Sequence, residues 1–289
     1  NIPISSFTAT ATPSVKKDII NLIGLKNHFE ITTGIDRENL KFSVLRVDKK
    51  ISYVLKYVEE NKGKQGIIYC LTRKTTDEVC NKLVSSGYNA VNYHAGLSDM
   101  ERSENQDKFL FDNANIIVAT NAFGMGIDKS NIRYVIHYNM PKNIESYYQE
   151  AGRAGRDNEP SDCILLFSPS DIAMNNFLIE NSSDNLDKSN EYEKLKEMIN
   201  YFNTDKCLRK FIINYFDQSY DKENCNNCSN CLRTIEKRDI TVEAQKILSC
   251  IYRMGQRFGM NLAIDVLKGS KSSKVKSFNF NTLSTYGIM

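Results

Sequence analysis

Short runs of apolar residues, rich in β-branched and aromatic side chains, recur along the middle of the chain. They lie at 66–70, 90–94, 115–120, 134–138 and 163–167. Runs of this length and composition predict buried strands. Helical spacing marks the stretches 74–86 and 98–110 between them, and Ser98 followed by Glu101 is typical of a capped helix start. This alternation predicts a parallel sheet covered by helices on both faces.

The pattern becomes helical and polar after residue 169. Residues 191–202 place apolar side chains at helical spacing, and the residues after Cys207 do the same. Two more amphipathic helices are expected at 242–254 and 262–267. A separate piece is expected to begin near Asp239, and no internal repeat is apparent.

Length and composition describe an ordinary globular chain. Its 289 residues suffice for about two domains of roughly 100–200 residues each, and 41% hydrophobic with 25% charged residues is typical of a folded protein. No apolar run approaches the roughly 18 residues of a membrane span, and no signal peptide is visible. We expect a cytoplasmic protein with no membrane contact, and the Asn start suggests a piece of a longer protein.

The formal charge of +3 is too small to identify a nucleic-acid-binding protein, but it is unevenly distributed. Residues 253–276 alone carry +5. Gly and Ser in this basic segment would let a phosphate backbone approach closely. Contact with DNA and a merely solvated loop are both compatible with this pattern. The basic side chains are Arg253, Arg257, Lys268, Lys271, Lys274 and Lys276.

Four of the eight cysteines form a group with metal-ligand spacing: Cys207, Cys225, Cys228 and Cys231. Two gaps of two residues let the backbone wrap around one ion, and a more distant ligand joins the loop to a helix. Four thiolates fill the zinc shell, which predicts a structural rather than a catalytic metal. A pair of disulfides is the alternative, and it requires an oxidising compartment. The other cysteines have apolar neighbours and are expected to be buried.

Two loops next to the predicted strands are rich in reactive side chains. Residues 121–128 combine an amide, two glycines and a carboxylate directly after a strand. Residues 149–157 place Arg153 and Arg156 three positions apart, each preceded by Gly or Ala. Such a pair suits phosphate oxygens, with a surface salt-bridge cluster as the alternative.

These motifs resemble the RecQ family of DNA helicases. Residues 8–11, 118–128 and 148–157 are similar to its third, fifth and sixth helicase motifs, the cysteine spacing to its zinc-binding domain, and residues 243–258 to the start of its winged helix. The resemblance implies an α/β fold, with a RecA-like parallel sheet domain followed by a helical zinc-binding domain and a partial winged helix. The expected boundaries are 1–34 (remnant of a first RecA-like domain, and linker), 35–170 (second RecA-like domain), 171–235 (zinc-binding domain) and 236–289 (start of the winged-helix or RQC domain).

The resemblance also implies roles for individual residues. Arg156 matches the family's arginine finger, which stabilises charge on the γ-phosphate of ATP. Arg153, the second catalytic candidate, would flank the same nucleotide together with Gln149 or couple it to DNA. Gln149, Gly126 and Asp128 would lie on the nucleotide side. Arg73, His94 and Thr120 would touch the tracking single strand, although a packed structural imidazole remains open for His94. Duplex DNA would meet the winged helix at Arg253, Lys268, Lys271 and Lys274.

The sequence contains no phosphate loop of the form G-x-x-x-x-G-K-[ST]. The resemblance implies that ATP and magnesium bind a first RecA-like domain present in cis in the full-length parent. We therefore expect a parent that is an ATP-driven 3′ to 5′ DNA helicase in DNA repair and recombination, nucleoid-associated if bacterial, and a chain that alone hydrolyses no ATP. A stand-alone zinc-containing DNA-binding module is the alternative. A DEAD-box RNA helicase fits less well, because those proteins usually place His where Gln149 stands and lack the zinc group.

Overall fold

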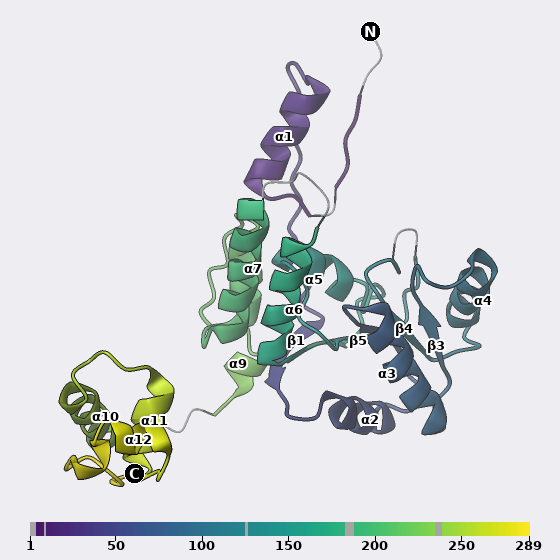
Figure 1. The fold of residues 1–289 in the computed structure, drawn as a ribbon. Coiled ribbons are helices and arrows are strands. Elements are labelled where there is room, and N and C mark those ends of the chain that lie inside the picture. The colour runs from purple at the N-terminus through teal and green to yellow at the C-terminus, as the bar shows by residue number, and fades with distance from the viewer. Residues whose placement is uncertain (1–3, 9, 125–126, 183–187, 235–238) are drawn as a thin grey trace. The chain divides into compact units, whose positions relative to one another are not determined.

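The computed structural model describes residues 4–8, 10–124, 127–182, 188–234 and 239–289. The chain divides into two compact units, Asn1–Arg233 and Thr234–Met289, and each is described by itself (Figure 1). Within the described residues, no helix has the length and apolar character needed to cross a membrane.

A six-stranded parallel sheet forms the centre of the first unit (Figure 1). Its order is β1-β6-β5-β2-β4-β3. The chain leaves β2 toward β3 on one side and β5 toward β6 on the other, so the connections diverge between β2 and β5. Parallel sheets form a crevice at the carboxyl ends of the strands at such a point. The bounds are β1 Leu40–Arg46, β2 Gln65–Tyr69, β3 Ala90–Tyr93, β4 Ile116–Ala119, β5 Ile132–His137 and β6 Ser161–Phe167.

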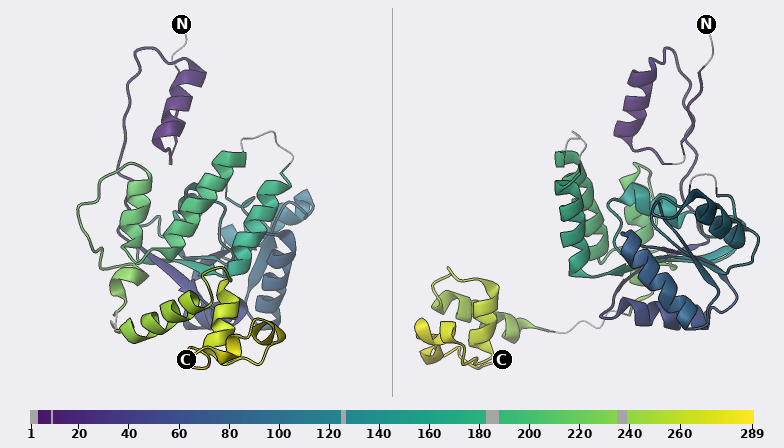
Figure 2. Two further views of the ribbon diagram at one scale, coloured as in Figure 1. Left: turned by 60° about the vertical axis from the view of Figure 1, so that its left-hand side comes forward. Right: turned by 45° about the vertical axis from the view of Figure 1, so that its right-hand side comes forward.

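Helices cover both faces of the sheet (Figure 2). One face packs against α2 (Lys50–Glu60) and α3 (Arg73–Ser85) in a core that includes Val54 and Leu83. The other face packs against α4 (Asp99–Leu110) and α5 (Ile144–Ala151). The parallel sheet covered on both faces, as the sequence predicts, is confirmed.

The core on the sheet face that α4 and α5 cover continues without a break into the helices that follow the sheet. These are α6 (Pro169–Glu180), α7 (Lys188–Asn203), α8 (Leu208–Tyr215) and the short α9 (Ser229–Leu232). The ring of Phe202 on α7 stacks on Phe167 of β6 with centroids 3.4 Å apart, and Tyr201 packs on Tyr147 of α5. The sheet and the cysteine-bearing region therefore share one hydrophobic core.

Strand β1 is the element that the apolar runs do not predict. Lys41 and Ser43 interrupt its apolar positions, as expected for a strand at the edge of the sheet. Part of its outer edge is covered, because Ser229 Oγ at the start of α9 accepts a hydrogen bond from the backbone N–H of Val44 at 3.2 Å. This contact ties the cysteine-bearing region to the sheet.

Two helical parts remain. The N-terminal helix α1 (Pro13–Ile23) begins at the N-cap Thr12 and has no buried residue. The second unit contains α10 (Thr241–Arg253), α11 (Met260–Leu267), α12 (Ser273–Ser277) and a 3₁₀ turn, Phe280–Thr282. A small core that includes Cys250, Val266 and Val275 holds this unit together.

Candidate functional site

The loop that follows α5 carries the two arginines of the sequence motif, and we call residues 152–157 the arginine loop. It lies at the amino end of β5, where the backbone N–H of Gly155 donates to the carbonyl of Ile132 at 2.8 Å. Arg153 is only 8% exposed, and its guanidinium donates to the carbonyl of Gly124. Arg153 therefore binds the protein's own backbone.

Arg156 differs from its neighbour because its side chain is 35% exposed. Its guanidinium donates to Asp128 Oδ1 and to the carbonyl of Ile127, both at 2.9 Å. The Asp128 side chain is 89% exposed. An arginine held by an exposed carboxylate presents its remaining donors to solvent, in a geometry that also suits phosphate oxygens. Gln149 on α5 is exposed as well, and Gly126 lies outside the described residues.

The other predicted contact residues lie at the opposite edge of the sheet. Arg73 is the exposed first residue of α3, after β2, and Thr120 directly follows β4. His94 directly follows β3, and only 5% of it is exposed. Its Nδ1 accepts from the Gly96 N–H at 3.1 Å, so Nε2 donates to Asp77 at 2.9 Å. Both ring nitrogens are therefore used inside the protein.

The chain passes from one of these edges to the other between residues 120 and 128, and we call its described residues, 120–124 and 127–128, the linking segment. It begins at Thr120 on the carboxyl edge of the sheet and ends at Asp128 beside the arginine loop. Tyr69 at the end of β2 donates its hydroxyl to the carbonyl of Phe123 at 3.1 Å. Arg153 binds the next carbonyl, that of Gly124. These two contacts connect the end of β2 with Arg153, and Arg156 binds residues 127 and 128 of the same segment.

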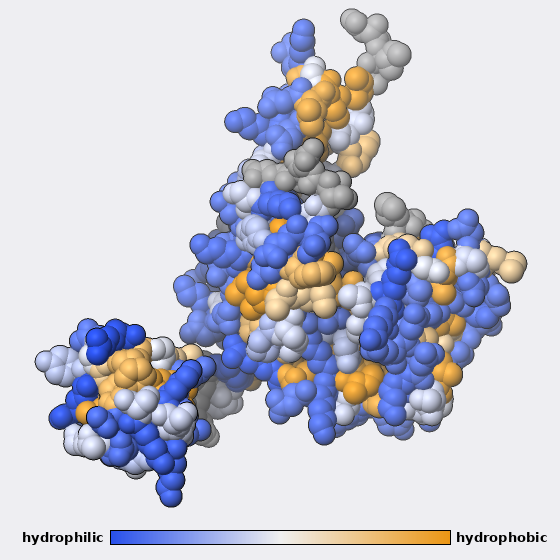
Figure 3. Space-filling model, viewed as in Figure 1, coloured by the Kyte–Doolittle hydropathy of each residue, from blue (hydrophilic) through white to orange (hydrophobic). Residues whose placement is uncertain are grey.

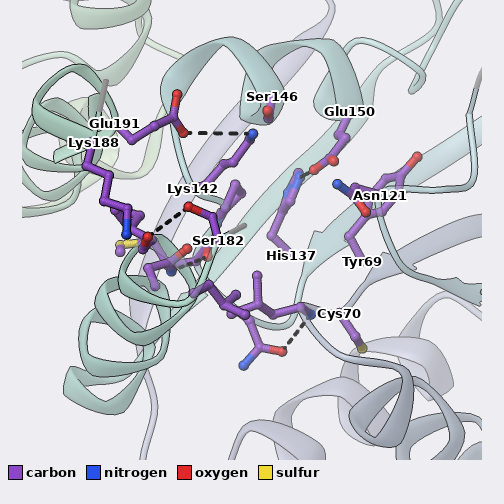
Figure 4. Close-up of a pocket in the computed structure, with 17 residues that line it drawn as sticks. Tyr69, Cys70, Asn121, His137, Lys142, Ser146, Glu150, Ser182, Lys188 and Glu191 are labelled. Carbon is purple, nitrogen blue, oxygen red and sulfur yellow. Dashed lines mark hydrogen bonds and ion pairs between the residues drawn. The ribbon is translucent and has the colours of Figure 1, made fainter. Parts of the chain in front are cut away.

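A cavity of about 420 Å³ opens at the carboxyl ends of β2 and β5, where the connections diverge (Figure 4). Its walls include Asn121 of the linking segment and the buried His137 at the end of β5. His137 Nε2 lies 2.9 Å from Glu150 Oε2, and its ring stacks on Tyr69. Burial raises the pKa of the Tyr69 hydroxyl.

The four cysteines come together as their spacing predicts. The sulfurs of Cys207, Cys225, Cys228 and Cys231 all lie within 4.8 Å of one another. Four sulfurs bound at about 2.3 Å to one tetrahedral ion are about 3.8 Å apart, so the group fits zinc. Disulfide formation requires a sulfur separation of about 2.05 Å, whereas the sulfurs of Cys225 and Cys231 are 3.9 Å apart.

Backbone groups support the thiolate form of these ligands. The N–H of Leu208 points at Cys228 Sγ and that of Lys210 at Cys207 Sγ, each at 3.4 Å. Burial opposes ionisation of Cys225, but the Asn227 N–H and hydrogen bonds from the neighbouring thiols lower its pKa. Metals bind thiolates, so these contacts favour a metal centre. Burial raises the pKa of Cys207 and Cys231 in the same group, as it does for the packed Cys70 and Cys163 thiols, so the lowered pKa belongs to Cys225.

The basic residues of the second unit lie around α10–α12. Arg253 ends α10, Lys268 is the C-cap of α11, Lys271 precedes α12 and Lys274 lies in its first turn; all four are exposed. Asp265, the only acidic residue of the segment, accepts from the Ser272 hydroxyl at 3.4 Å.

The space-filling view shows mostly hydrophilic surface, with apolar groups around α6, where Met174, Phe177 and Leu178 are exposed (Figure 3).

Sequence patterns miss several residues that shape the site. Asp77, the partner of His94, lies one helical turn after Arg73, and this spacing is a usable signal. Glu150 lies inside the arginine motif but attracts attention only through its contact with His137. Arg37 binds the arginine loop from a position 115 residues before Gly152, and no local pattern indicates such a contact.

Comparisons with known families assign three consecutive segments. The helicase conserved C-terminal domain matches residues 49–158, the RecQ zinc-binding domain 169–232 and the RQC domain 234–289. The solved structure of yeast Dbp5 bound to RNA and ADP BeF3 is similar in fold, with a TM-score of 0.53 at 19% identity over 68% of this chain and 48% of that one.

Curated relatives match nearly the whole chain. The ATP-dependent DNA helicase RecQ of Bacillus subtilis is 46% identical over 99% of this chain and 48% of its own length. The protein of the same name from Pasteurella multocida is 38% identical over 99% of this chain and 45% of its own. The yeast ATP-dependent helicase SGS1 is 36% identical over 100% of this chain and 21% of its own. The chain thus spans about half the length of the bacterial relatives.

Proposed function

Because the chain belongs to the RecQ family of DNA helicases, we propose that it forms the C-terminal part of an ATP-dependent 3′ to 5′ DNA helicase acting in DNA repair and recombination. A first RecA-like domain in cis would bind ATP and magnesium. The proposed parts of this chain are 1–34 as remnant and linker, 35–170 as second RecA-like domain, 171–235 as zinc-binding domain and 236–289 as the start of the winged helix. A location with chromosomal DNA in the cytoplasm would follow.

The observation that carries the proposal is the linking segment between the two edges of the sheet. Thr120 begins it at the strand ends, Arg153 binds it at Gly124, and Arg156 binds it at Asp128. In the proposed cycle, ATP at the arginine loop would draw Arg156 from Asp128 toward the γ-phosphate. That movement would be transmitted to the strand ends through the linking segment.

In this proposal Arg156 is the arginine finger and Arg153 supports it. Arg156 is exposed and already binds an oxyanion, whereas Arg153 is buried on a backbone carbonyl. A finger of this kind contributes about 10³- to 10⁵-fold to the rate of phosphoryl transfer. Gln149, Gly126 and Asp128 would complete the nucleotide side.

Single-stranded DNA would follow the carboxyl edge of the sheet, where Arg73 and Thr120 lie. His94 would reach a phosphate only if its contacts with Asp77 and Gly96 opened. Duplex DNA would contact the second unit at its exposed basic residues. These are Arg253, Lys268, Lys271 and Lys274.

The zinc would be structural, because four cysteine ligands leave no position for water or substrate. The chain alone is proposed to hydrolyse no ATP, since its sequence contains no phosphate loop. Magnesium-dependent, DNA-stimulated ATP hydrolysis by the chain itself would contradict this part of the proposal.

The central test is Arg156→Ala in the complete gene product. Turnover of ATP should fall by about 10³-fold or more, because charge on the transferred phosphate loses its partner. Binding of a fluorescent ATP analogue should be largely kept. Arg102→Ala is a matched control, since Arg102 is 34% exposed and is also paired with an aspartate. Normal turnover by the Arg156 variant would remove this residue from the proposed role.

A further inference from the structure

Arg37, a residue that precedes β1, binds the backbone of the arginine loop with its side chain. The Arg37 guanidinium donates to three carbonyl oxygens of the loop, those of Gly152 at 3.4 Å, Ala154 at 3.2 Å and Gly155 at 2.5 Å. Asn39 adds a hydrogen bond from Nδ2 to the same Gly155 oxygen at 2.8 Å. We propose that Arg37 is a positioning residue for the arginine loop, an inference that rests on the proposed role of Arg156 in that loop.

The carbonyls that Arg37 binds lie directly around the two functional arginines. Gly152 precedes Arg153, while Ala154 and Gly155 separate it from Arg156. Gly155 has φ +56°, and a Cβ there would meet the Glu159 carbonyl at 2.7 Å, so this turn of the loop requires glycine. A planar guanidinium can bind several carbonyls in fixed directions. Removing it would free the backbone that aims Arg156.

The backbone of Arg37 is in turn bound by a residue of the cysteine-bearing region. Arg209, two residues after the zinc-ligand candidate Cys207, is only 3% exposed. Its guanidinium donates to the Arg37 carbonyl at 2.7 Å and to the Glu38 carbonyl at 3.3 Å, and it pairs with Asp36. The cysteine-bearing region is therefore connected to the arginine loop by two successive contacts. Arg209 binds the backbone of Arg37, and the Arg37 side chain binds the loop.

A second contact from the same group acts on the neighbouring backbone. The amide of Asn227, between Cys225 and Cys228, donates to the carbonyls of Glu38 at 3.1 Å and Leu40 at 3.2 Å. Both the helix after Cys207 and the loop between the next two ligands thus hold the segment that carries Arg37. Residues beside two of the cysteines, Arg209 and Asn227, therefore fix the backbone from which Arg37 reaches the arginine loop.

The first test uses the chain itself and measures backbone hydrogen exchange. Arg37→Ala should speed exchange in residues 152–158 while β4 keeps its protection, and Arg37→Lys should restore part of it. Arg46→Ala is the matched control, because Arg46 ends β1 and contacts Phe202 and Asn203 but not the arginine loop. Arg209→Ala should loosen the same loop as Arg37→Ala. Unchanged exchange of the loop in the Arg37 variant would overturn the inference.

The second test separates kcat from KM in the complete gene product. Arg37→Ala should lower kcat for ATP about 10- to 100-fold through misplacement of Arg156, with KM changed by no more than about twofold. If Arg156→Ala abolishes turnover while Arg37→Ala does not alter kcat, the positioning role fails and the proposed function stands. If Arg156→Ala has no effect on turnover, the proposed function fails, whatever the loop exchange shows.

Discussion

At the scale of single residues, the site depends on which backbone atoms the arginines can reach. Arg153 binds the Gly124 carbonyl across a contact that leaves no space for a side chain. A Cβ at Gly124 would lie 2.1 Å from one Arg153 guanidinium nitrogen. The φ of +150° at this position is also one that residues with side chains rarely adopt. Gly124 therefore has a steric and a conformational reason to be glycine.

Gly124→Ala should displace Arg153 and strain the backbone. We expect the chain to lose about 1–3 kcal/mol of stability in denaturant unfolding, the usual cost of a strained conformation. ATP turnover by the complete gene product should fall as well, because the linking segment loses its contact with the arginine loop. Gly34→Ala serves as the control, since a Cβ there would meet nothing within 4 Å. Equal stability of the two variants would show that the Arg153 contact adapts freely.

At the scale of elements, apolar runs and helix-capping residues in the sequence predict the strands and helices that local interactions determine. The strands at the centre of the sheet are continuous apolar runs, and α4 starts at the Ser98–Glu101 capping box that the sequence indicates. Strand β1 has a mixed pattern and takes its place through pairing with β6. The contact of Arg209 with Asp36 spans 173 positions, and no periodicity reports such a pairing. Long-range polar contacts are therefore what the sequence leaves unpredicted in the candidate site.

The four cysteines that the sequence spacing singles out lie together in the structure. Removing a metal bound to them should affect more than one element. We expect about one zinc per chain, and its loss by chelation or Cys228→Ser should expose α7 and α8 to hydrogen exchange. Because those helices share a core with the sheet face that α5 covers, protection there should fall too. Metal binding supplies folding free energy at sites of this kind.

Cys80→Ala is the control for metal content, since Cys80 is buried against the other face of the sheet. It should keep one zinc and normal exchange in α7 and α8. A Cys228→Ser chain that retains one zinc, or a chelated chain with unchanged protection in these helices, would refute the structural role.

At the scale of the whole molecule, packing joins two of the three matched segments into one unit and leaves the third as a unit of its own. The first unit continues through the zinc-binding region without a break in its core, while the second unit has a small core of its own. The net charge of +3 conceals a segment of +5 in that second unit. Electrostatic contact with DNA should therefore depend disproportionately on residues 253–276.

Replacing Lys268, Lys271 and Lys274 together by Ala should weaken DNA binding similarly for all sequences. If each lysine neutralises one phosphate, the slope of log K against log salt should decrease by up to about 2.7, since each contact contributes about 0.9. The control replaces Lys56, Lys62 and Lys64, which are exposed in and after α2 and give the same change in net charge. Fluorescence anisotropy with a forked duplex across a salt series measures both variants. Equal slopes for the two variants would mean that these lysines act only through the net charge of the protein. That result would contradict the proposed contact of the segment with duplex DNA.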